Sequence, residues 1–362
     1  MKILHLADFH LGHRCYGIER RQNALKNNFL SNHVGGLNHT IDRIKPDLIL
    51  IAGDIFDNSN PLHEDTFLMQ QWILMTKEKC DIIGITGNHD KQTDSSVQVS
   101  QLLGIHDPTV FDLLNIQCFD HMYRSQLKEM AEAIEPCDIL MLHQSACGFL
   151  PSIMKPEIDE DVLKVLAEKC TYLALGDLHI HRKMQVGECS ITYPGALDFL
   201  RVGEPHTKFG GWLLEELDNG FVCNSLEIVP YQKTHVIEIN DPQHYVHLHQ
   251  LINEESAFYV IRAIEHPTLF AETKKLLQLR QQTDENFCFI LKEYQRKEIV
   301  TVEESAKSES DDDFIEILSK DKTIEDTDRK LASDLWSAPA PKAMQSLLSH
   351  DLSEELEKVK IL

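Results

Sequence analysis

Short runs of apolar residues recur through the first half of the chain, and polar residues follow each run. The five runs are KILHLADFH from Lys2, DLILIAGDIFD from Asp47, DIIGITGNHD from Asp81, DILMLHQS from Asp138 and YLALGDLHIH from Tyr172. Unbroken apolar runs of this length are typical of strands buried on both faces of a sheet. The pattern therefore predicts five buried strands, each followed by Asp, Asn or His.

Helical patterns lie between these strands, for example DTFLMQQWILMTKEK from Asp65 and DEDVLKVLAEKC from Asp159. Alternating strands and helices predict an α/β layered sheet. Because the carboxyl ends of neighbouring parallel strands lie side by side, the polar clusters should meet at one edge of the sheet. We therefore expect one site built from residues that are far apart in the sequence.

The pattern changes after Gly195. The segments GGWLLEEL and FVCNSLEIVP predict antiparallel strands that close a first domain, residues 1–232. Alternating strand and helix patterns, HVIEI, QHYVHLHQLI, FYVIRAIE, AETKKLLQLRQQ and FCFILKEY, predict a small α+β domain over residues 233–299. Residues 300–362 begin with the acidic stretch EESAKSESDDD, typical of a linker. They end in AMQSLLSHDLSEELEKVKIL, a predicted helix whose apolar face should pack on this chain or on a partner.

The formal net charge of -23 limits the ways in which this protein can bind nucleic acid. It excludes a protein that holds nucleic acid over its whole surface, because such binding needs Lys and Arg at the phosphates. A local basic patch, bound cations or a partner can still supply positive charge. Arg14, Arg20 and Arg21 either contact phosphates or begin a solvated helix, and the sequence leaves both interpretations open.

Composition also bears on the compartment. The nine cysteines form no CxxC pair, which indicates reduced thiols, and no apolar run approaches the ~20 residues of a membrane-spanning helix. We expect a cytoplasmic protein that does not enter a membrane. Among the histidines, His5 should be a buried strand residue, and His13, His63, His106 and His121 are interpreted as surface or structural residues.

The polar residues after the strands are oxygen and imidazole donors, with no thiolate among them. They are Asp8, His10, Asp54, Asn88, His143, Asp177 and His179. Two divalent cations about 3.5–4 Å apart need a bridging carboxylate and several such ligands, and they can then activate a water and hold a phosphate. This donor set suits manganese, magnesium or iron better than a structural zinc site.

These motifs resemble those of the calcineurin-like metallophosphoesterases, in which DxH, GDxxD, GNH(D/E), H and GHxH occur in this order. The resemblance covers residues 1 to about 200 and implies a layered sandwich of β-sheets flanked by helices, with a small α+β capping domain and a C-terminal helical tail. Within that family the chain is most similar to the SbcD-type nuclease subunits of SbcCD DNA-repair complexes. The supporting segments are HLG at His10–Gly12, FDNSNP at Phe56–Pro61 and YPGAL at Tyr193–Leu197.

The resemblance implies roles for individual residues. One metal would be held by Asp8, His10, Asp54 and His179, and a second by Asp54, Asn88, His143 and Asp177, so that Asp54 bridges the two. His89 would be the acid that helps the leaving oxygen depart, and Asp57 would orient the imidazole of His89.

The chain departs from the family at one motif. Gly176-Asp177-Leu178-His179 stands where the family has GHxH, so a carboxylate replaces the first imidazole. Asp177 would add negative charge and favour a harder cation such as manganese or magnesium. The alternative is that His179 and His181 are the two ligands. We favour Asp177, because the residues before it match the approach to the family motif.

For function, the resemblance implies a two-metal DNA exonuclease and endonuclease that acts in DNA repair or recombination with an SMC-like ABC ATPase of the SbcC type. The C-terminal helix would contact the ATPase, and a homodimer would form through helices after the GDxxD and GNHD motifs. Manganese is the expected metal, with magnesium as the alternative. Two other interpretations stay open: a phosphatase or cyclic-nucleotide phosphodiesterase of the same fold, and a scaffold subunit with a degenerate site. The sequence identifies no DNA-contacting residue.

Overall fold

The computed structural model describes residues 1–91, 99–150, 155–201, 208–217, 220–239, 248, 252, 257–264, 267–283 and 287–294. They form two compact units. The first comprises the described residues of Met1–Gly17 and Gln22–Tyr231, and the second comprises Ile18–Arg21 and the described residues from Gln232 onward. The expected acidic linker and C-terminal helix lie outside the described residues. Within the described part of the chain, no helix has the length and apolar character needed to cross a membrane.

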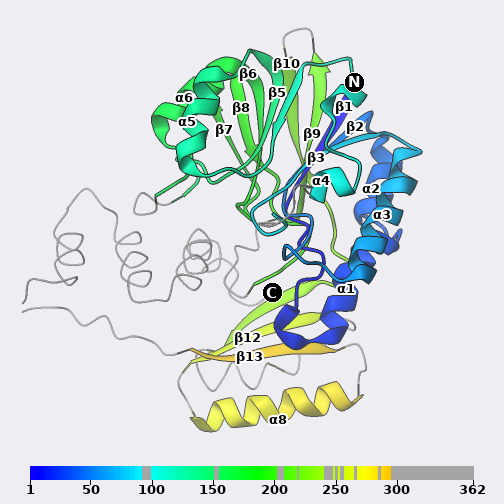
Figure 1. Cartoon of the computed structure of the whole chain (residues 1–362). Helices are drawn as coiled ribbons and strands as arrows, with labels where there is room; N and C mark the ends of the chain where they lie inside the picture. The colour runs from blue at the N-terminus through cyan, green and yellow to red at the C-terminus, as the bar shows by residue number, and fades with distance from the viewer. Residues whose placement is uncertain are drawn as a thin grey trace, which may run out of the picture. The chain divides into compact units, whose positions relative to one another are not determined.

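Two five-stranded sheets form the centre of the first unit (Figure 1). The first sheet has the order β10-β9-β1-β2-β3, with β1 (Lys2–Leu6), β2 (Leu48–Ala52), β3 (Asp81–Ile85), β9 (Gly210–Leu217) and β10 (Gly220–Glu227). The second has the order β4-β5-β6-β8-β7, with β4 (Ile116–Phe119), β5 (Cys137–His143), β6 (Cys170–Gly176), β7 (Arg182–Val186) and β8 (Cys189–Tyr193). The pairs β1–β9, β9–β10 and β7–β8 are antiparallel, and the other strand pairs of these two sheets are parallel.

Helices cover the outer faces of this sandwich (Figure 1). On the side of the first sheet lie α1 (Glu19–Leu30), α2 (Leu37–Ile44), α3 (His63–Lys77) and the short α4 (Val99–Leu102). On the side of the second sheet lie α5 (Arg124–Ala133) and α6 (Glu160–Lys169). Two 3-10 turns, η1 (Cys15–Gly17) and η2 (Pro108–Val110), complete the regular structure. The predicted α/β sandwich flanked by helices is confirmed.

Burial on both faces explains why the strands are unbroken apolar runs. In β2, Leu48, Leu50 and Ala52 belong to the core between the two sheets. The alternate residues Ile49 and Ile51 belong to the core between the first sheet and its helices. Because successive side chains of a strand point to opposite faces, a strand between two apolar layers needs an apolar residue at every position.

The strand registers bring the polar segments to one end of the sandwich. Leu6, near the end of β1, lies beside Ile51, and Ala52 at the end of β2 lies beside Ile85 of β3. In the second sheet His143 lies beside Gly176, the last residue of β6. The segments that follow β1, β2, β3, β5 and β6 therefore leave the two sheets at neighbouring points. The sequence predicted this meeting of polar segments, but at the edge of a single sheet.

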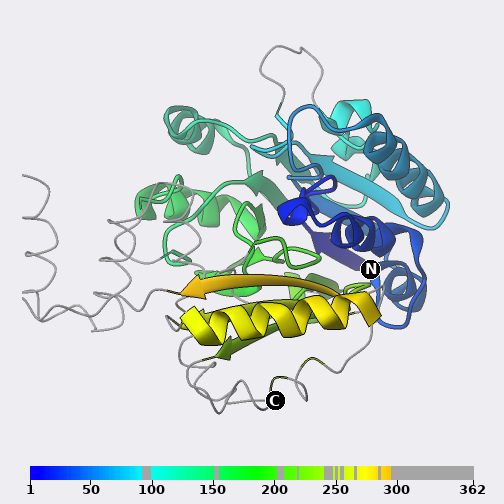
Figure 2. The same ribbon diagram turned by 90° about the horizontal axis from the view of Figure 1, so that it is seen from below.

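The second unit contains a parallel sheet of β11 (Thr234–Ile239), β12 (Phe258–Ile264) and β13 (Cys288–Tyr294). The helix α8 (Pro267–Thr283) lies along this sheet (Figure 2). Its residue Leu277 packs with Tyr259, Ile261 and Phe287 in one buried cluster. These strands and this helix coincide with predicted ones, whereas the helix predicted over QHYVHLHQLI falls almost wholly outside the described residues.

Candidate metal centre

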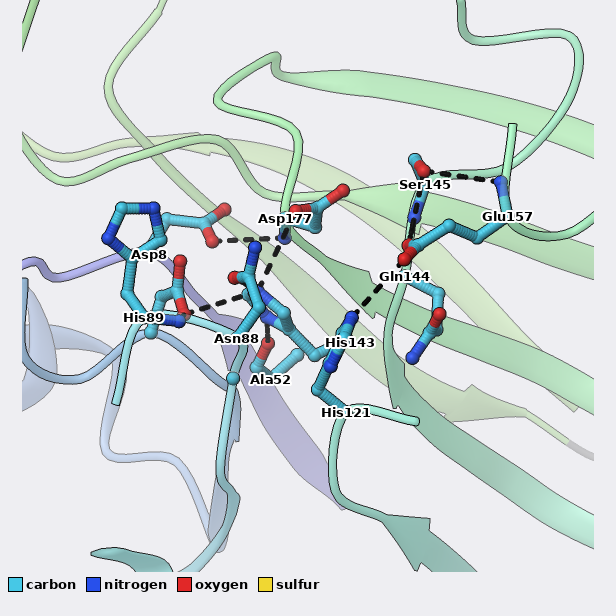
Figure 3. Close-up of polar contacts among 12 residues, drawn as sticks. Asp8, Ala52, Asn88, His89, His121, His143, Gln144, Ser145, Glu157 and Asp177 are labelled. Atoms are coloured by element: carbon cyan, nitrogen blue, oxygen red, sulfur yellow. Dashed lines mark hydrogen bonds and ion pairs between the residues drawn. The ribbon is translucent and has the colours of Figure 1, made fainter. Parts of the chain in front are cut away.

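The seven candidate ligands lie together at the end of the sandwich where the parallel strands terminate. Ligand atoms of Asp8, His10 and His179 lie within 4.8 Å of one another, and the same holds for Asp8, Asp54 and His143. Figure 3 shows the second part of this cluster, where His143 and Asn88 meet and the carboxylate of Asp8 turns toward the main chain of Asp177. Five separate segments thus contribute to one cluster.

Two imidazoles face each other on one side of the cluster. Nε2 of His10 lies 2.9 Å from Nε2 of His179. The other ring nitrogen of His10, Nδ1, contacts Oδ1 of Asp57 at 3.2 Å. A carboxylate that accepts from Nδ1 fixes the ring and leaves the Nε2 lone pair for a cation, which is the usual arrangement behind a metal-bound histidine.

Asp54 lies between the two parts of the cluster. Its Oδ2 is 3.3 Å from His10 Nε2, and its Oδ1 is 3.3 Å from His143 Nε2. Oδ1 also accepts the main-chain N–H of His89 at 2.9 Å. A ligand that bridges two cations must direct one oxygen to each of them. The Asp54 carboxylate does this, because each of its oxygens is directed to one set of donors.

His143 is oriented by the main chain of β2. Its Nδ1 donates to the carbonyl oxygen of Ala52 at 2.7 Å, because a carbonyl can only accept. Nε2 therefore faces the cluster, 3.1 Å from Asn88 Oδ1 and 3.9 Å from Asp177 Oδ1. The imidazole of His143, the amide oxygen of Asn88 and two carboxylates, those of Asp54 and Asp177, surround a second position for a cation.

The backbone is held in a costly conformation at four of these ligands. Asp8, His10, Asp54 and Asp177 have φ angles of 55°, 45°, 49° and 98°. Positive φ is uncommon for residues other than glycine and concentrates at functional sites, where the surrounding structure maintains it. The loops are thus shaped to direct these side chains inward.

Glycine makes room for the cluster. A Cβ built at Gly53 would overlap the His143 ring, and a Cβ built at Gly87 would overlap Asp54 Oδ1. Gly53 also has a φ of 89°, which an L side chain rarely adopts. The glycines of the GDIFD and GNHD motifs are therefore required by close packing around the ligands.

Burial and charge have shifted the pKa values of the acidic groups. Burial raises the pKa of Asp8 to about 7 and that of Asp177 to about 6. Burial would also raise the pKa of Asp54, but the imidazoles of His143 and His10 outweigh it and hold this pKa well below its usual range. For His143, burial would lower the pKa, but the Asp54 carboxylate raises it well above the ordinary value. Without a metal, a proton on His143 supplies the positive charge that these carboxylates need.

The donor set fits divalent cations. Asp8 Oδ2 is buried and has no hydrogen-bond partner among the described residues, which is costly unless a cation occupies the neighbouring space. The paired Nε2 atoms of His10 and His179 likewise need a shared proton or a cation between them. Oxygen and imidazole donors without thiolate suit a divalent metal, and their clustering identifies a candidate divalent-metal centre.

Asp57 contacts two kinds of partner, one through its main chain and one through its side chain. Its main-chain carbonyl accepts from His89 Nδ1 at 3.0 Å. Its carboxylate oxygen Oδ1 contacts His10 Nδ1 at 3.2 Å and His13 Nδ1 at 2.9 Å. The carboxylate thus orients a candidate ligand, and the peptide group orients His89. His13, interpreted from the sequence as a surface or structural residue, is the outer partner of this carboxylate.

His181 is directed away from the cluster. Its Nδ1 lies 2.9 Å from the carbonyl oxygen of Pro194 and its Nε2 lies 2.7 Å from Ser225 Oγ. Its ring stacks on Trp212, with 4.4 Å between centroids and 9° between planes. Of the two alternatives for the GDLHIH segment, this geometry favours Asp177 with His179.

Asp90 and Glu157 near the centre were not singled out from the sequence, and His121 was interpreted there as a surface or structural residue. Asp90 is fully buried and accepts the main-chain N–H groups of Ile55 at 2.7 Å and Gly87 at 2.6 Å, which ties two ligand loops together. Its place in the GNHD motif was the available signal. His121 and Glu157 form a contact of 3.2 Å beside His143 (Figure 3), and no motif marks either residue.

Comparison with known proteins agrees with this geometry. Residues 1–161 match the family described as calcineurin-like phosphoesterase. A DNA double-strand break repair protein Mre11 from Methanococcus maripaludis is 26% identical over 262 residues, which cover 63% of this chain and 66% of that protein. The protein of the same name from Methanosarcina mazei is 29% identical over 221 residues, covering 55% of this chain and 33% of that protein. The chain therefore spans less than two thirds of the length of either relative.

Among solved structures, the chain matches Vps29 from Entamoeba histolytica in complex with zinc. It is 14% identical, and the match covers 63% of this chain and 100% of that one, with a TM-score of 0.31. The family match and the two Mre11 relatives support the resemblance to calcineurin-like metallophosphoesterases and to their nuclease subunits.

Proposed function

With residues 1–161 identified as a calcineurin-like phosphoesterase domain, we propose that this chain is a two-metal DNA nuclease, the nuclease subunit of an SbcCD-like complex in DNA repair or recombination. The observation that carries the proposal is the position of Asp54, with one carboxylate oxygen toward His10 and the other toward His143. The relatives named Mre11 support DNA as the substrate class.

The proposed ligand sets follow the two sides of Asp54. Asp8, His10, Asp54 and His179 hold the first cation, and Asp54, Asn88, His143 and Asp177 hold the second. When bound, two such cations supply a water that ionises near neutral pH and positive charge opposite the phosphate. The oxygen-rich second set supports manganese, with magnesium as the alternative.

His89 is proposed as the acid for the leaving oxygen. Its Nδ1 donates to the carbonyl oxygen of Asp57, so Nδ1 always carries a proton and Nε2 is the nitrogen that gains and releases one. The main-chain N–H of His89 also donates to Asp54, which fixes the residue against the metal centre. A positioned imidazole of this kind can protonate a departing alkoxide.

The remaining expectations belong to the same proposal. The tail at residues 300–362 would bind an SbcC-type ABC ATPase, the domain at 233–299 would cap the nuclease domain, and the complex would act in the cytoplasm. Dimer formation through α3 is supported by its exposed apolar side chains, which include Phe67 at 56% and Leu74 at 60% of full exposure.

The first experiment measures manganese-dependent cutting of an end-labelled linear duplex by the purified protein, with bis(p-nitrophenyl) phosphate as a small phosphodiester for comparison. We expect cutting by the wild type and its loss in Asp54→Ala, while the exposed Asp161→Ala keeps wild-type activity. Turnover of the small ester without any cutting of DNA would instead support the small-substrate phosphoesterase. Metal binding without either reaction would support the scaffold.

A further inference from the structure

An exposed aromatic ring stands beside the metal centre. Tyr123 is 67% exposed, and the ammonium nitrogen of Lys91 lies 5.0 Å from the centre of its ring. The chain as a whole is strongly acidic, with a formal net charge of -23. The Lys91 ammonium group places a positive charge at this exposed ring despite that overall charge. Aromatic rings combined with cations are typical of surfaces that bind single-stranded nucleic acid.

A short path of rings joins Tyr123 to the centre. The ring centroids of Tyr123 and His121 are 6.5 Å apart, and those of His121 and His143 are 6.3 Å apart. Tyr123 therefore lies within two ring-to-ring steps of a proposed metal ligand. A stacked strand advances by roughly 3.4 Å per nucleotide, so the separation of the Tyr123 and His143 rings corresponds to a few nucleotides. A base at Tyr123 would therefore lie a few nucleotides from a phosphate at the metal centre.

His121, which lies between Tyr123 and His143, is held by hydrogen bonds to two neighbouring segments. The main-chain N–H of His121 donates to the Thr86 carbonyl at 2.9 Å, and His121 Nε2 contacts Glu157 Oε1 at 3.2 Å. The other carboxylate oxygen of Glu157 accepts the main-chain N–H of Ser145 at 3.0 Å (Figure 3). His121 is therefore fastened both to the segment after β3 and to the segment after β5.

Further hydrogen bonds hold the Tyr123 residue and the Lys91 ammonium group in place. Lys91 Nζ donates to the carbonyl oxygen of His121 at 3.0 Å, which holds the ammonium over the Tyr123 ring. The main-chain N–H of Tyr123 donates to Gln126 Oε1 at 3.0 Å, which anchors the residue at the start of α5. Both groups are positioned before any ligand arrives, so little ordering is needed on binding.

We propose that Tyr123 and Lys91 form a nucleotide subsite next to the metal centre, at which the tyrosine ring stacks on an unpaired base and the lysine contacts a phosphate of the same DNA strand. The inference rests on the proposed nuclease function and specifies part of its substrate. Lys91 covers one face of the ring, so the base stacks on the other. Because a base inside a duplex is already stacked on both faces, the subsite selects strands that are unpaired for a few nucleotides beside the cut.

The test compares steady-state cutting of a labelled single strand by wild type, Tyr123→Ala, Tyr123→Leu and Tyr123→Phe in manganese. Loss of a stacked base should raise KM by roughly 5- to 150-fold in the Ala and Leu variants. The Phe variant should keep the wild-type KM because it keeps the ring. Since stacking at a distance from the reacting atoms contributes equally to ground and transition states, kcat should not change. Hydrolysis of bis(p-nitrophenyl) phosphate should be the same in all four proteins.

Lys91 is tested through the salt dependence of binding to the same strand. Lys91→Ala should reduce the slope of log affinity against log salt concentration by about 0.7, the value for one phosphate contact on a single strand, whereas Lys164→Ala, which removes an exposed lysine on α6, should leave the slope unchanged.

A wild-type KM in Tyr123→Ala, or in Tyr123→Leu, would overturn the subsite while the nuclease function stands. A wild-type protein that hydrolyses the small ester but cuts no DNA would overturn both the nuclease function and the subsite.

Discussion

His10 and His179 meet with their Nε2 atoms 2.9 Å apart, although 169 residues separate them in the sequence. Two imidazole nitrogens at this distance repel unless they share a proton or a cation. The Asp57 carboxylate holds the far side of the His10 ring, so His10 cannot turn away without losing that contact. The pair therefore marks the position at which a cation and protons compete, and pH should control metal binding.

Stability without metal should fall as the pH rises from about 6.5 to 8. Burial raises the pKa of Asp8 to about 7 and that of Asp90 to about 7, far above the ordinary value of 3.8. A carboxyl group whose pKa is raised by folding contributes its stability below the unfolded pKa and loses it as the pH passes the folded value. His143 acts in the same direction, because its pKa is raised above 6.5.

The lower limit of this pH range has a physical reason. Burial lowers the pKa of His5 to about 3 and that of His10 to about 4, so these two groups destabilise the fold as the pH falls below 6.5 and oppose the carboxyl groups there. Thermal unfolding in EDTA should show a melting temperature that decreases from pH 6.5 to 8. With manganese the decrease should shrink, since deprotonated ligands bind metal more tightly. A melting temperature in EDTA that stays level or rises over this range would contradict the proposed burial of these groups.

The two alternatives for the GDLHIH segment predict opposite results for two variants. If Asp177 is a ligand, Asp177→Asn should weaken binding of the second manganese ion by at least tenfold, whereas His181→Ala should bind two ions as the wild type does. The physical reason is that both ring nitrogens of His181 contact groups outside the cluster. Isothermal titration with manganese measures both variants. Loss of an ion in His181→Ala, with none lost in Asp177→Asn, would reverse the assignment.

His89 should affect the reaction more than metal binding. His89→Gln removes the proposed acid, and cutting of linear DNA should fall by roughly 10²- to 10⁴-fold. The two manganese ions should remain bound, because the proposed ligand sets do not include His89. Metal analysis of the purified variant is the matched control, and loss of metal together with activity would instead identify His89 as a ligand. Metal analysis is needed because ligand atoms of His10, Asp54 and His89 also lie within 4.8 Å of one another.

The exposed apolar side chains of α3 predict self-association. Leu74→Glu should convert a dimer into a monomer, because it places a charge among the apolar groups of the proposed interface. Leu113→Glu introduces the same charge at an exposed leucine away from α3 and should leave the dimer intact. Light scattering after gel filtration distinguishes the two masses. A wild-type protein that is monomeric at every concentration would show that the expected homodimer is wrong.

The architecture of the first unit followed from local patterns in the sequence. The apolar run at Leu48–Ala52 is unbroken because its alternate residues face two different apolar layers, and this periodicity is visible without a structure. Convergence of Asp8 and Asp54 then follows from a general property of parallel sheets, whereas His143 reaches them only because a second sheet packs on the first. The buried parallel strands were therefore predictable from local patterns, whereas their division into two packed sheets was expected only from the family resemblance.

The support around the centre was not predictable in the same way. His121 and Glu157 are 36 residues apart, and their contact depends on two loops whose paths no residue pattern specifies. Asp57 was expected to orient His89, but which of its groups does so depends on the local backbone: the carbonyl contacts His89, and the carboxylate contacts His10 and His13. A motif identifies residue types at a strand end, but it does not say which atoms of those residues meet.

The number of manganese ions bound by the purified protein tests the central claim most directly. Equilibrium dialysis followed by elemental analysis should find two ions per chain in the wild type at pH 8. Asp54→Asn, which keeps the size of the side chain but removes its charge from between the two ligand sets, should bind one ion or none. Two ions in Asp54→Asn would contradict the bridging role of Asp54, and no ion in the wild type would contradict the metal centre itself.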